Sequence, residues 1–359
     1  MTAAAMRAPS APHGVDLPPD YLVLGRASTE NFPVASRLLP AAMRADIMAL
    51  YGWARLVDEL GDNYAGDRLA ALDEVERQLR TALGTAGEHT PAGEHTTAGE
   101  HASTGEHTTE GPPGRHPPEL SGPLALHPLV ATMAAAVRRR DLPVQPLFDL
   151  VQANRQDQSV ARYEVFSDLV GYCQLSANPV GRMVLAIFGL ATPERVEWSD
   201  SICTGLQLVE HWQDVAEDAI VGRTYIPQED LRRFGVSPEE LVPPPASYVD
   251  RRRRGAPGGS SSATRALVAF EAARARRLLD EGTPLVASLK GHLRYAVAGF
   301  VAGGHAALDA LAAVDFDIYA DTAKPASGRF SAHLVGLLAN AYRHGKPADG
   351  KRADGKRAK

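Results

Sequence analysis

Apolar residues return at intervals of three and four positions through most of this chain, and that periodicity limits the fold more than any other feature of the sequence. Met43, Ile47, Leu50 and Ala54 follow the pattern within residues 31–62. Such spacing places side chains on one face of an α-helix, whose repeat is about 3.6 residues. Ala, Leu, Arg and Glu are abundant and aromatic residues make up only 6%, which also favours helix. The sequence therefore predicts an all-α protein.

Prolines and Gly- or Ser-rich clusters indicate where these helices begin and end, because proline cannot continue a helix. The length admits one or two domains, since helical chains of this length often fold around one large core. We expect helices over residues 41–61, 68–83, 128–140, 146–156, 166–188, 193–221, 263–280, 284–311 and 331–343.

The predicted domain covers residues 29–345, after a disordered lead-in over 1–28 and before a disordered basic tail over 346–359. Within the domain we expect a low-complexity loop over 84–122 and a flexible loop over 242–262. From Arg343 onward the chain has seven Lys or Arg against two Asp. This charge predicts a solubilising tail, with weak attraction to anionic lipid, about 1 kcal/mol per basic residue near a surface, as the alternative.

Imperfect copies of Gly-Glu-His-Thr fill part of the low-complexity loop and place His89, His95, His101 and His107 six residues apart. Imidazole is a common metal ligand, so a metal site is one interpretation. A surface loop expanded by repeat slippage is favoured, because a polar tract of this kind gains too little from burial to offset its ordering entropy.

Charge and cysteine content exclude several classes of function. The net charge of −5 and the pI near 6.2 do not provide the basic footprint of a nucleic-acid-binding protein. Only Cys173 and Cys203 occur, too few for a disulfide framework or a multi-thiolate metal site, so a reducing cytoplasm is expected. Apolar runs such as Tyr295 to Ala302 are far shorter than the roughly 20 residues of a membrane-spanning helix. We therefore expect no bilayer-spanning segment.

A first group of acidic residues ends the apolar helix predicted at 41–61. Asp58 and Asp62 are four residues apart, so both carboxylates leave the helix from one face. Like charges at that spacing repel and destabilise a helix, which makes the pair informative. Arg55 lies three residues before Asp58, in a position to offset this repulsion or to contact a phosphate.

A second group lies within the helix predicted at 193–221. Gln207, Glu210, Asp214 and Asp218 follow in steps of three, four and four, which would place them along one helical stripe. Mg²⁺ prefers oxygen ligands and commonly joins one or two carboxylates to a substrate phosphate. One such pair alone would be as compatible with a solvated helix face as with a metal site. Two pairs, each in an apolar helix and each accompanied by an Arg, favour a diphosphate site with several Mg²⁺ ions.

These motifs resemble those of the squalene and phytoene synthase family, with Asp58 to Asp62 matching its first Asp-rich motif and Asp214 to Asp218 its second. The segments 168–181 and 222–227 also match, and the likeness covers most of residues 31–227, continuing weakly to about 313. The resemblance implies an isoprenoid-synthase helical bundle with a central cavity, acting on a prenyl diphosphate.

The same resemblance assigns roles to individual residues. Asp58, Asp62, Asp214 and Asp218 would hold two or three Mg²⁺ ions. Glu210 is added to this set, although many relatives carry Asn there, so whether it binds metal or tunes the site stays open. Tyr172 would assist diphosphate departure or proton transfer, with a core tyrosine as the alternative. The remaining positions are the catalytic candidates Tyr51 and Arg55 and the substrate-binding candidates Arg55, Gln207, Arg223, Tyr225 and Phe32.

Two segments, 30–36 and the Asn178–Pro179 pair, resemble the bacterial hopanoid-pathway branch, the hydroxysqualene synthases. This implies ionisation of presqualene diphosphate and capture of the cation by water, with no NADPH and with hand-over from other enzymes of that pathway. The branch implies a cytoplasmic enzyme, with transient contact at the inner membrane face as an option. The alternatives are a squalene, dehydrosqualene or phytoene synthase that joins two prenyl diphosphates, or a non-enzymatic relative that serves as a scaffold.

Overall fold

The computed structural model describes residue 15 and residues 17–24, 41–84, 126–243, 259–320 and 327–344. Within these ranges the regular structure is helical, and the strand-like pairing is one isolated bridge between Arg162 and Thr224. The all-α expectation is confirmed. The basic tail expected over 346–359, nearly all of the loop expected at 84–122 with its His repeats, most of the loop expected at 242–262, and Phe32 lie outside the described residues.

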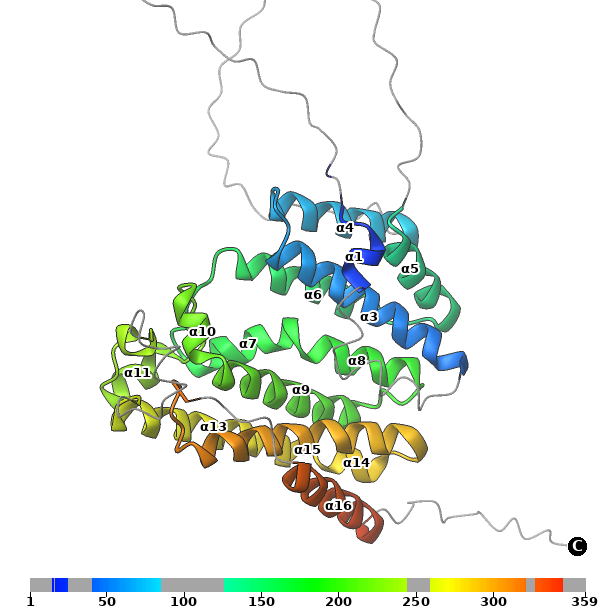
Figure 1. Cartoon of the computed structure of the whole chain (residues 1–359). Helices are drawn as coiled ribbons and strands as arrows, with labels where there is room; N and C mark the ends of the chain where they lie inside the picture. The colour runs from blue at the N-terminus through cyan, green and yellow to red at the C-terminus, as the bar shows by residue number, and fades with distance from the viewer. Residues whose placement is uncertain are drawn as a thin grey trace, which may run out of the picture.

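The helices form successive groups along the molecule (Figure 1). Helix α3 packs against α1, α4, α5, α6 and α8, and α9 packs against α7, α8, α13, α14 and α15. The first group comprises α1 (Asp20–Leu24), α3 (Ala41–Asp62), α4 (Arg68–Leu83), α5 (Pro128–Arg140) and α6 (Gln145–Asp157). The middle group comprises α7 (Phe166–Ser176), α8 (Asn178–Ile187), α9 (Pro193–Gln213), α10 (Val215–Ile220), α11 (Gln228–Phe234) and the 3₁₀ helix η2 (Pro238–Leu241). The last comprises α13 (Ser262–Gly282), α14 (Pro284–Ser288), α15 (Gly291–Ala313) and α16 (Ser327–His344).

Local capping residues explain why several helices begin and end where the sequence predicts. The side chain of Asp67 accepts a hydrogen bond from the backbone N–H of Ala70 at 3.0 Å and so caps α4. Gly84 ends α4 with φ +77°, a left-handed conformation that glycine adopts without a steric penalty. Thr192 and Ser261 cap α9 and α13 in the same way as Asp67. These caps are local signals, which is why they can be read from sequence.

Two long helices expected from the sequence are broken in the structure. The helix expected at 166–188 divides into α7 and α8 at Ala177, because Pro179 lacks the N–H that a continuous helix would use. The helix expected at 284–311 divides into α14 and α15, with extended backbone at Leu289 and Lys290. The helix expected at 193–221 is also broken, at Asp214, within the second acidic motif.

Part of the expected disordered lead-in is ordered. Residues 20–24 form α1, and the Val23 side chain is buried against the core made with α3. The expectation of disorder is therefore wrong at residues 20–24. A five-residue helix with one fully buried apolar side chain is too short to show a recognisable periodicity in the sequence. Helices α11 and η2 were missed for the same reason of length.

Two large apolar clusters divide the interior. One lies among α1, α3, α4, α5, α6 and α8 and includes Trp53, Leu56 and Met183. The other lies mainly among α7, α9, α11, α13 and α15 and includes Tyr172. Helix α8 joins the first cluster to a smaller one with α9, α14 and α15, because Met183 belongs to the first and Leu185 to the smaller one. Helix α9 joins that smaller cluster to the second large one through Ile202 and Leu208.

Helix α15 is the described helix that is long and apolar enough to cross a membrane by length and composition. Half of its most apolar window is buried inside the protein, and it packs against α9, α13, α14 and α16. A core helix of a globular protein passes the same length and composition test. The apolar run at Tyr295 to Ala302 is thus part of a longer apolar segment, Gly291–Ala313, than the run alone indicates.

Candidate active site

The first acidic motif lies in the last two turns of α3. Trp53, Leu56 and Val57 bury one face of this helix completely, so Asp58 and Asp62 emerge on the opposite, wetter face. Their side chains are 47% and 56% exposed. Arg55 lies beside Asp58, with 3.7 Å between its Nη1 and a carboxylate oxygen. The structure therefore brings Arg55 and both aspartates to one region of α3, as the spacing predicts.

Tyr51 lies seven residues before Asp58, two helical turns away on the same side of α3. Its side chain is buried. The structure thus places Tyr51 deeper in the protein than the two aspartates of the motif.

The second acidic motif is interrupted at Asp214, within a helix that the sequence predicts to be continuous. Helix α9 ends at Gln213, and Asp214 has φ −104° and ψ 12°, outside the helical range, before α10 begins at Val215. The break keeps a turn on each side, because the backbone N–H of Asp214 donates to the Glu210 carbonyl at 3.0 Å and that of Asp218 donates to the Asp214 carbonyl at 2.8 Å. Glu210, Asp214 and Asp218 therefore still follow one another at intervals of one turn.

Burial and crowding oppose ionisation in this second motif. Burial, aided by neighbouring Asp214, raises the pKa of Asp218 to about 7. Burial is also the main cause that raises the pKa of Asp214 and of Glu210, with Glu217 and Asp214 as the respective charged neighbours. Carboxylates held together at such a cost are stabilised by a bound cation. This donor set, all oxygen and short of positive charge, fits Mg²⁺.

Arg223 lies between the two acidic motifs. Gly222 turns the chain after α10 with φ +81°, a conformation suited to glycine, and the backbone N–H of Arg223 donates to the Asp218 carbonyl at 2.9 Å. The guanidinium then lies 4.0 Å from a carboxylate oxygen of Asp62 and donates to the backbone carbonyl of Asp157 at 3.3 Å. Arg223 therefore joins the end of α10, the end of α3 and the end of α6.

Asp157, which the sequence analysis missed, is the hydrogen-bond partner of Tyr172. The Tyr172 hydroxyl donates to one Asp157 carboxylate oxygen at 2.8 Å, while the other oxygen is buried without a hydrogen-bond partner in the described protein. Burial raises the pKa of Asp157 to about 6, despite the hydrogen bond from Tyr172 and the charge of Arg223. The pKa of Tyr172 is also raised, mainly by burial and by the Asp157 charge.

One sequence signal could have identified Asp157. It is the last residue of α6, and a negative charge at the C-terminus of a helix opposes the helix dipole. An Asp in an electrostatically unfavourable position is a better functional candidate than an Asp elsewhere on the surface.

Aromatic rings gather next to Tyr172. Tyr163 and Tyr225 have ring centroids 5.6 and 6.0 Å from that of Tyr172, and His211 stacks on Tyr225 with centroids 3.7 Å apart. The imidazole of His211 lies 3.2 Å from the side-chain amide nitrogen of Gln207. Burial lowers the pKa of His211 to about 3, so this ring is neutral at ordinary pH. The result is an uncharged aromatic wall beside the charged residues.

Backbone pairing holds this wall in place. The segment after α6 and the segment after α10 run side by side, with the N–H of Thr224 donating to Ala161 at 2.9 Å and the N–H of Gln228 donating to Tyr163 at 2.9 Å. The segment 222–227, one of the motifs predicted from the sequence, is thereby fixed beside Tyr163. This pairing places both Tyr225 and Arg223 at the site.

In the part of the chain that the structure describes, no three His, Cys, Asp or Glu side chains converge into a metal-binding group. The metal roles of Asp58, Asp62, Glu210, Asp214 and Asp218 therefore stay predictions. The residues brought together directly are Tyr172, Tyr225, Arg223 and Asp62, joined by the missed residues Asp157, Tyr163 and His211.

The sequence and the fold are similar to those of known proteins. Residues 26–331 match the family model of squalene/phytoene synthases. A hydroxysqualene synthase of Sinorhizobium fredii is 30% identical over 277 residues, which cover 75% of this chain and 74% of that protein. A phytoene synthase of Arthrospira platensis is 28% identical over 283 residues, 75% of each chain. A solved structure described as squalene synthase HpnC from Alicyclobacillus acidocaldarius is 32% identical, has a TM-score of 0.63, and covers 83% of this chain and 95% of its own.

With the match to the family model spanning most of the sequence and the helical fold shared with a solved relative, the chain belongs to the squalene/phytoene synthase family, whose members act on prenyl diphosphates.

Proposed function

We propose that this protein is a hydroxysqualene synthase, which converts presqualene diphosphate and water into hydroxysqualene and diphosphate. The observation that supports this most is the junction at Arg223, which joins the first acidic motif, the turn after the second, and Asp157. The Arg223 guanidinium, which would bind diphosphate in this proposal, lies next to the Tyr172–Asp157 pair. The likeness to hydroxysqualene synthases at about 30% identity supports the choice of reaction within the family.

In this proposal the charged end of the site binds the diphosphate. Arg223 and Arg55 would contact its oxygens, since a guanidinium donates two parallel hydrogen bonds to such a group. Mg²⁺ would be held by Asp58, Asp62, Asp214 and Asp218, with Glu210 beside them, and would neutralise charge that grows on the leaving group. The fit rests on the all-oxygen donor set at the end of α9 and in α10, where burial, aided by neighbouring Asp214, raises the pKa of Asp218 to about 7.

The reaction breaks the C–O bond of presqualene diphosphate, and diphosphate leaves with the bonding electron pair. The cation that remains rearranges and adds the oxygen of a water molecule. The aromatic faces of Tyr163, Tyr225 and neutral His211 suit a cationic carbon skeleton, because ring faces attract positive charge. One proton must leave the added water. We assign its removal to the Tyr172 hydroxyl, which passes its own proton to the Asp157 carboxylate at 2.8 Å.

The second candidate is a synthase that joins two prenyl diphosphates, such as a phytoene or squalene synthase. Phytoene synthases match this chain at 28% identity over a similar length, which is the observation that supports it. Both candidates use the same acidic motifs. They differ in the substrate and in whether the cation is captured by water, by hydride or by loss of a proton.

Product analysis distinguishes the two candidates. Purified protein with Mg²⁺ is incubated with presqualene diphosphate and, separately, with farnesyl diphosphate, each with and without NADPH. Hydroxysqualene formed from presqualene diphosphate without NADPH is the expected result. Squalene formed only with NADPH, or any condensation product from farnesyl diphosphate alone, would replace the proposal with the second candidate.

We also propose a cytoplasmic enzyme that receives its substrate from the reaction that condenses two farnesyl diphosphates. Presqualene diphosphate, a cyclopropyl-carbinyl diphosphate, contains the carbon skeletons of two farnesyl groups, so such a condensation must supply it.

A further inference from the structure

The last turn of α6 contacts three parts of the active site. Asp157 accepts the hydrogen bond from Tyr172 through its side chain and the one from Arg223 through its carbonyl. Gln158, the next residue, donates from its side-chain amide to the carbonyl of Gly61 at 3.0 Å, within the first acidic motif. A displacement of this turn would therefore alter the position of Tyr172, of Arg223 and of the end of α3 together.

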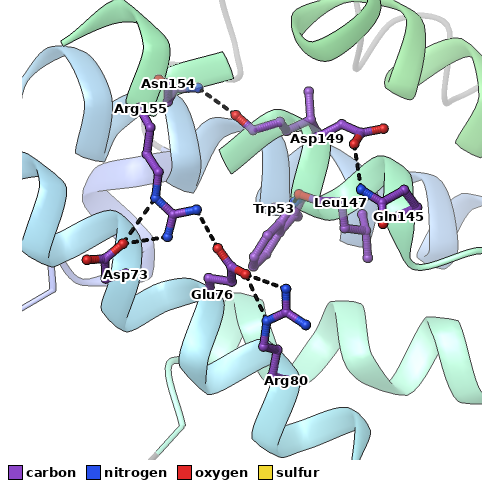
Figure 2. Close-up of polar contacts among 10 residues, drawn as sticks. Trp53, Asp73, Glu76, Arg80, Gln145, Leu147, Asp149, Asn154 and Arg155 are labelled. Atoms are coloured by element: carbon purple, nitrogen blue, oxygen red, sulfur yellow. Dashed lines mark hydrogen bonds and ion pairs between the residues drawn. The ribbon is translucent and has the colours of Figure 1, made fainter. Parts of the chain in front are cut away.

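Helix α6 approaches α3 closely at this turn. A Cβ atom at Gly61 would lie 2.0 Å from the side-chain oxygen of Asn154, a distance that real Cβ atoms do not show. The Asn154 amide is held in turn by the Leu150 carbonyl at 3.2 Å (Figure 2). The geometry at the junction leaves little room for α6 to shift toward α3.

Arg155 anchors the same turn on the side of α4. Its Nη1 donates to Glu76 at 2.5 Å, and its Nε and Nη2 donate to one oxygen of Asp73 at 3.0 and 2.5 Å (Figure 2). Arg155 is two residues before Asp157 in the sequence. Two carboxylates of α4 thus fix the Arg155 guanidinium. Asp157, two residues later in the chain, lies in the active site.

Glu76 is itself held in place from a second direction. Its other carboxylate oxygen accepts a hydrogen bond from Arg80 at 2.8 Å, and the Arg80 guanidinium lies 4.1 Å from the ring centroid of Phe148 on α6. The Glu76 side chain is only 9% exposed, so water competes weakly for these bonds. Burial alone would raise the pKa of Glu76, but the hydrogen bonds from Arg155 and Arg80 outweigh it, so the pKa is below its ordinary value.

We propose that Arg155, fixed by Glu76 and Asp73, is a positioning residue that sets the place of Asp157 and, through it, of Tyr172 and Arg223. The inference deepens the proposed function and rests on it for the chemical role of Asp157. Displacing a catalytic group by about 1 Å can cost about 100-fold in rate, so a residue remote from the substrate can act in this way. A substitution at Arg155 changes the rate without removing a group that contacts the substrate.

An ion pair elsewhere in the protein provides a matched control. Arg182 on α8 donates from Nε and Nη2 to Asp200 on α9, at distances from 2.6 to 3.2 Å. Its side chain is 32% exposed, against 24% for that of Arg155. The two arginines therefore have similar burial, and both pair with carboxylates, Arg155 with two and Arg182 with one, but Arg155 is the one next to Asp157.

The test is a double-mutant cycle on kcat. Arg155→Ala is expected to lower kcat about 10- to 100-fold while KM changes less than about twofold, and Arg155→Lys to restore part of the loss. In a protein that already carries Asp157→Asn, adding Arg155→Ala is expected to cause little further loss, because both changes affect the same step. Arg182→Ala is expected to leave kcat near the wild-type value. Losses that multiply in the double variant, or an equal loss in Arg182→Ala, would overturn the proposal.

A second measurement does not depend on the reaction. The protein is labelled with 3-fluorotyrosine, and the ¹⁹F signal of Tyr172 is identified with Tyr172→Phe. That signal is expected to shift in Arg155→Ala and in Glu76→Gln, which keeps the side-chain shape, but not in Arg182→Ala. An unchanged signal in both Arg155→Ala and Glu76→Gln would refute the positioning role. A wild-type protein that converts neither substrate would instead count against the proposed function, while this spectrum still decides the role of Arg155.

Discussion

At the scale of single residues, the two acidic motifs are unlike each other. Asp58 and Asp62 are about half exposed, and α3 turns them away from a completely buried face. Asp214 is exposed and Asp218 half-buried, and desolvation together with neighbouring carboxylates raises the pKa of both. The sequence shows two similar Asp-x-x-x-Asp patterns, yet the first lies in one continuous helix and the second lies at a junction crowded with carboxylates.

We expect loss of either motif to have the same effect on kcat. Asp58→Asn and Asp214→Asn should each lower kcat at least about 100-fold, because each removes a charge that would balance a metal ion during diphosphate departure. Helical circular dichroism should be unchanged. Asp149→Asn, in a half-buried carboxylate that accepts a hydrogen bond from Gln145 on the same helix, is the control and should retain activity. Retained activity in either motif variant would contradict the metal assignment.

The Tyr172–Asp157 pair predicts a pH dependence. Asp157 accepts the Tyr172 proton only when ionised, and its pKa is about 6. With saturating Mg²⁺, kcat should therefore fall as the pH is lowered through about 6. Asp157→Asn should lower kcat and remove this acidic limb from the profile. A limb of unchanged midpoint in Asp157→Asn would show that another group titrates there.

The residues found from sequence were those in recognisable patterns. Asp58, Asp62, Arg55 and Tyr172 belong to spaced or motif-like segments, and the structure brings Asp62 and Tyr172 to the Arg223 junction. Tyr163, His211 and Asp157 were missed, because each contributes as a single side chain brought in by tertiary packing.

At the scale of helices, starts and ends were easier to predict than breaks. The bounds of α4 and α5 agree with expectation, because Asp67, Gly84 and Pro128 are local signals at their ends. The break at Asp214 has no proline or glycine to announce it, and the periodic pattern continues across it. The consequence is that the second motif is a helix junction, which sequence spacing alone could not reveal.

A buried carboxyl between two helices predicts how stability depends on pH. Glu271 on α13 is fully buried, and burial raises its pKa from 4.5 to about 8, although Arg274 opposes this. Between these pH values the folded protein holds a proton that the unfolded chain has released. The free energy of unfolding should therefore decrease as pH rises from about 4.5 to about 8.

Glu271→Gln should weaken this decrease, because the amide cannot titrate. Urea unfolding of wild type and variant at pH 5, 6.5 and 8 measures it. The variant should gain stability relative to wild type toward pH 8. The two slopes against pH would be equal if Glu271 were ionised in the folded protein.

At the scale of the whole molecule, the two large apolar clusters are joined through α8, α9 and the smaller cluster between them. The sequence predicts one bundle from its continuous periodicity, but it does not indicate which helices pack together. That information lies in contacts between helices far apart in the chain, such as α9 with α13 and α3 with α6. A single sequence carries no local signal for such pairings.

Shared helices predict that the clusters unfold together. Met183→Ala, in a side chain with no exposed surface, should lower the free energy of unfolding by about 2–5 kcal/mol. The transition should stay single, with far-UV and near-UV circular dichroism changing at the same denaturant concentration. Val335→Ala, in an exposed apolar side chain on α16, is the control and should change stability by less than about 0.5 kcal/mol. Two separated transitions would mean that α8 does not couple the clusters.

The pairing of the segment after α6 with the segment after α10 also bears on the order of folding. Arg223 contacts Asp157 across 66 positions of sequence, whereas most helical contacts are local. Closing a long loop costs entropy before its contacts form, so we expect helices to appear early and this pairing late. A chain still emerging from synthesis, with α10 not yet made, would have Tyr172 and Asp157 but no guanidinium at position 223 beside them. The Arg223 guanidinium would then reach the carbonyl of Asp157, and with it the Tyr172 pair, only when this late pairing has formed.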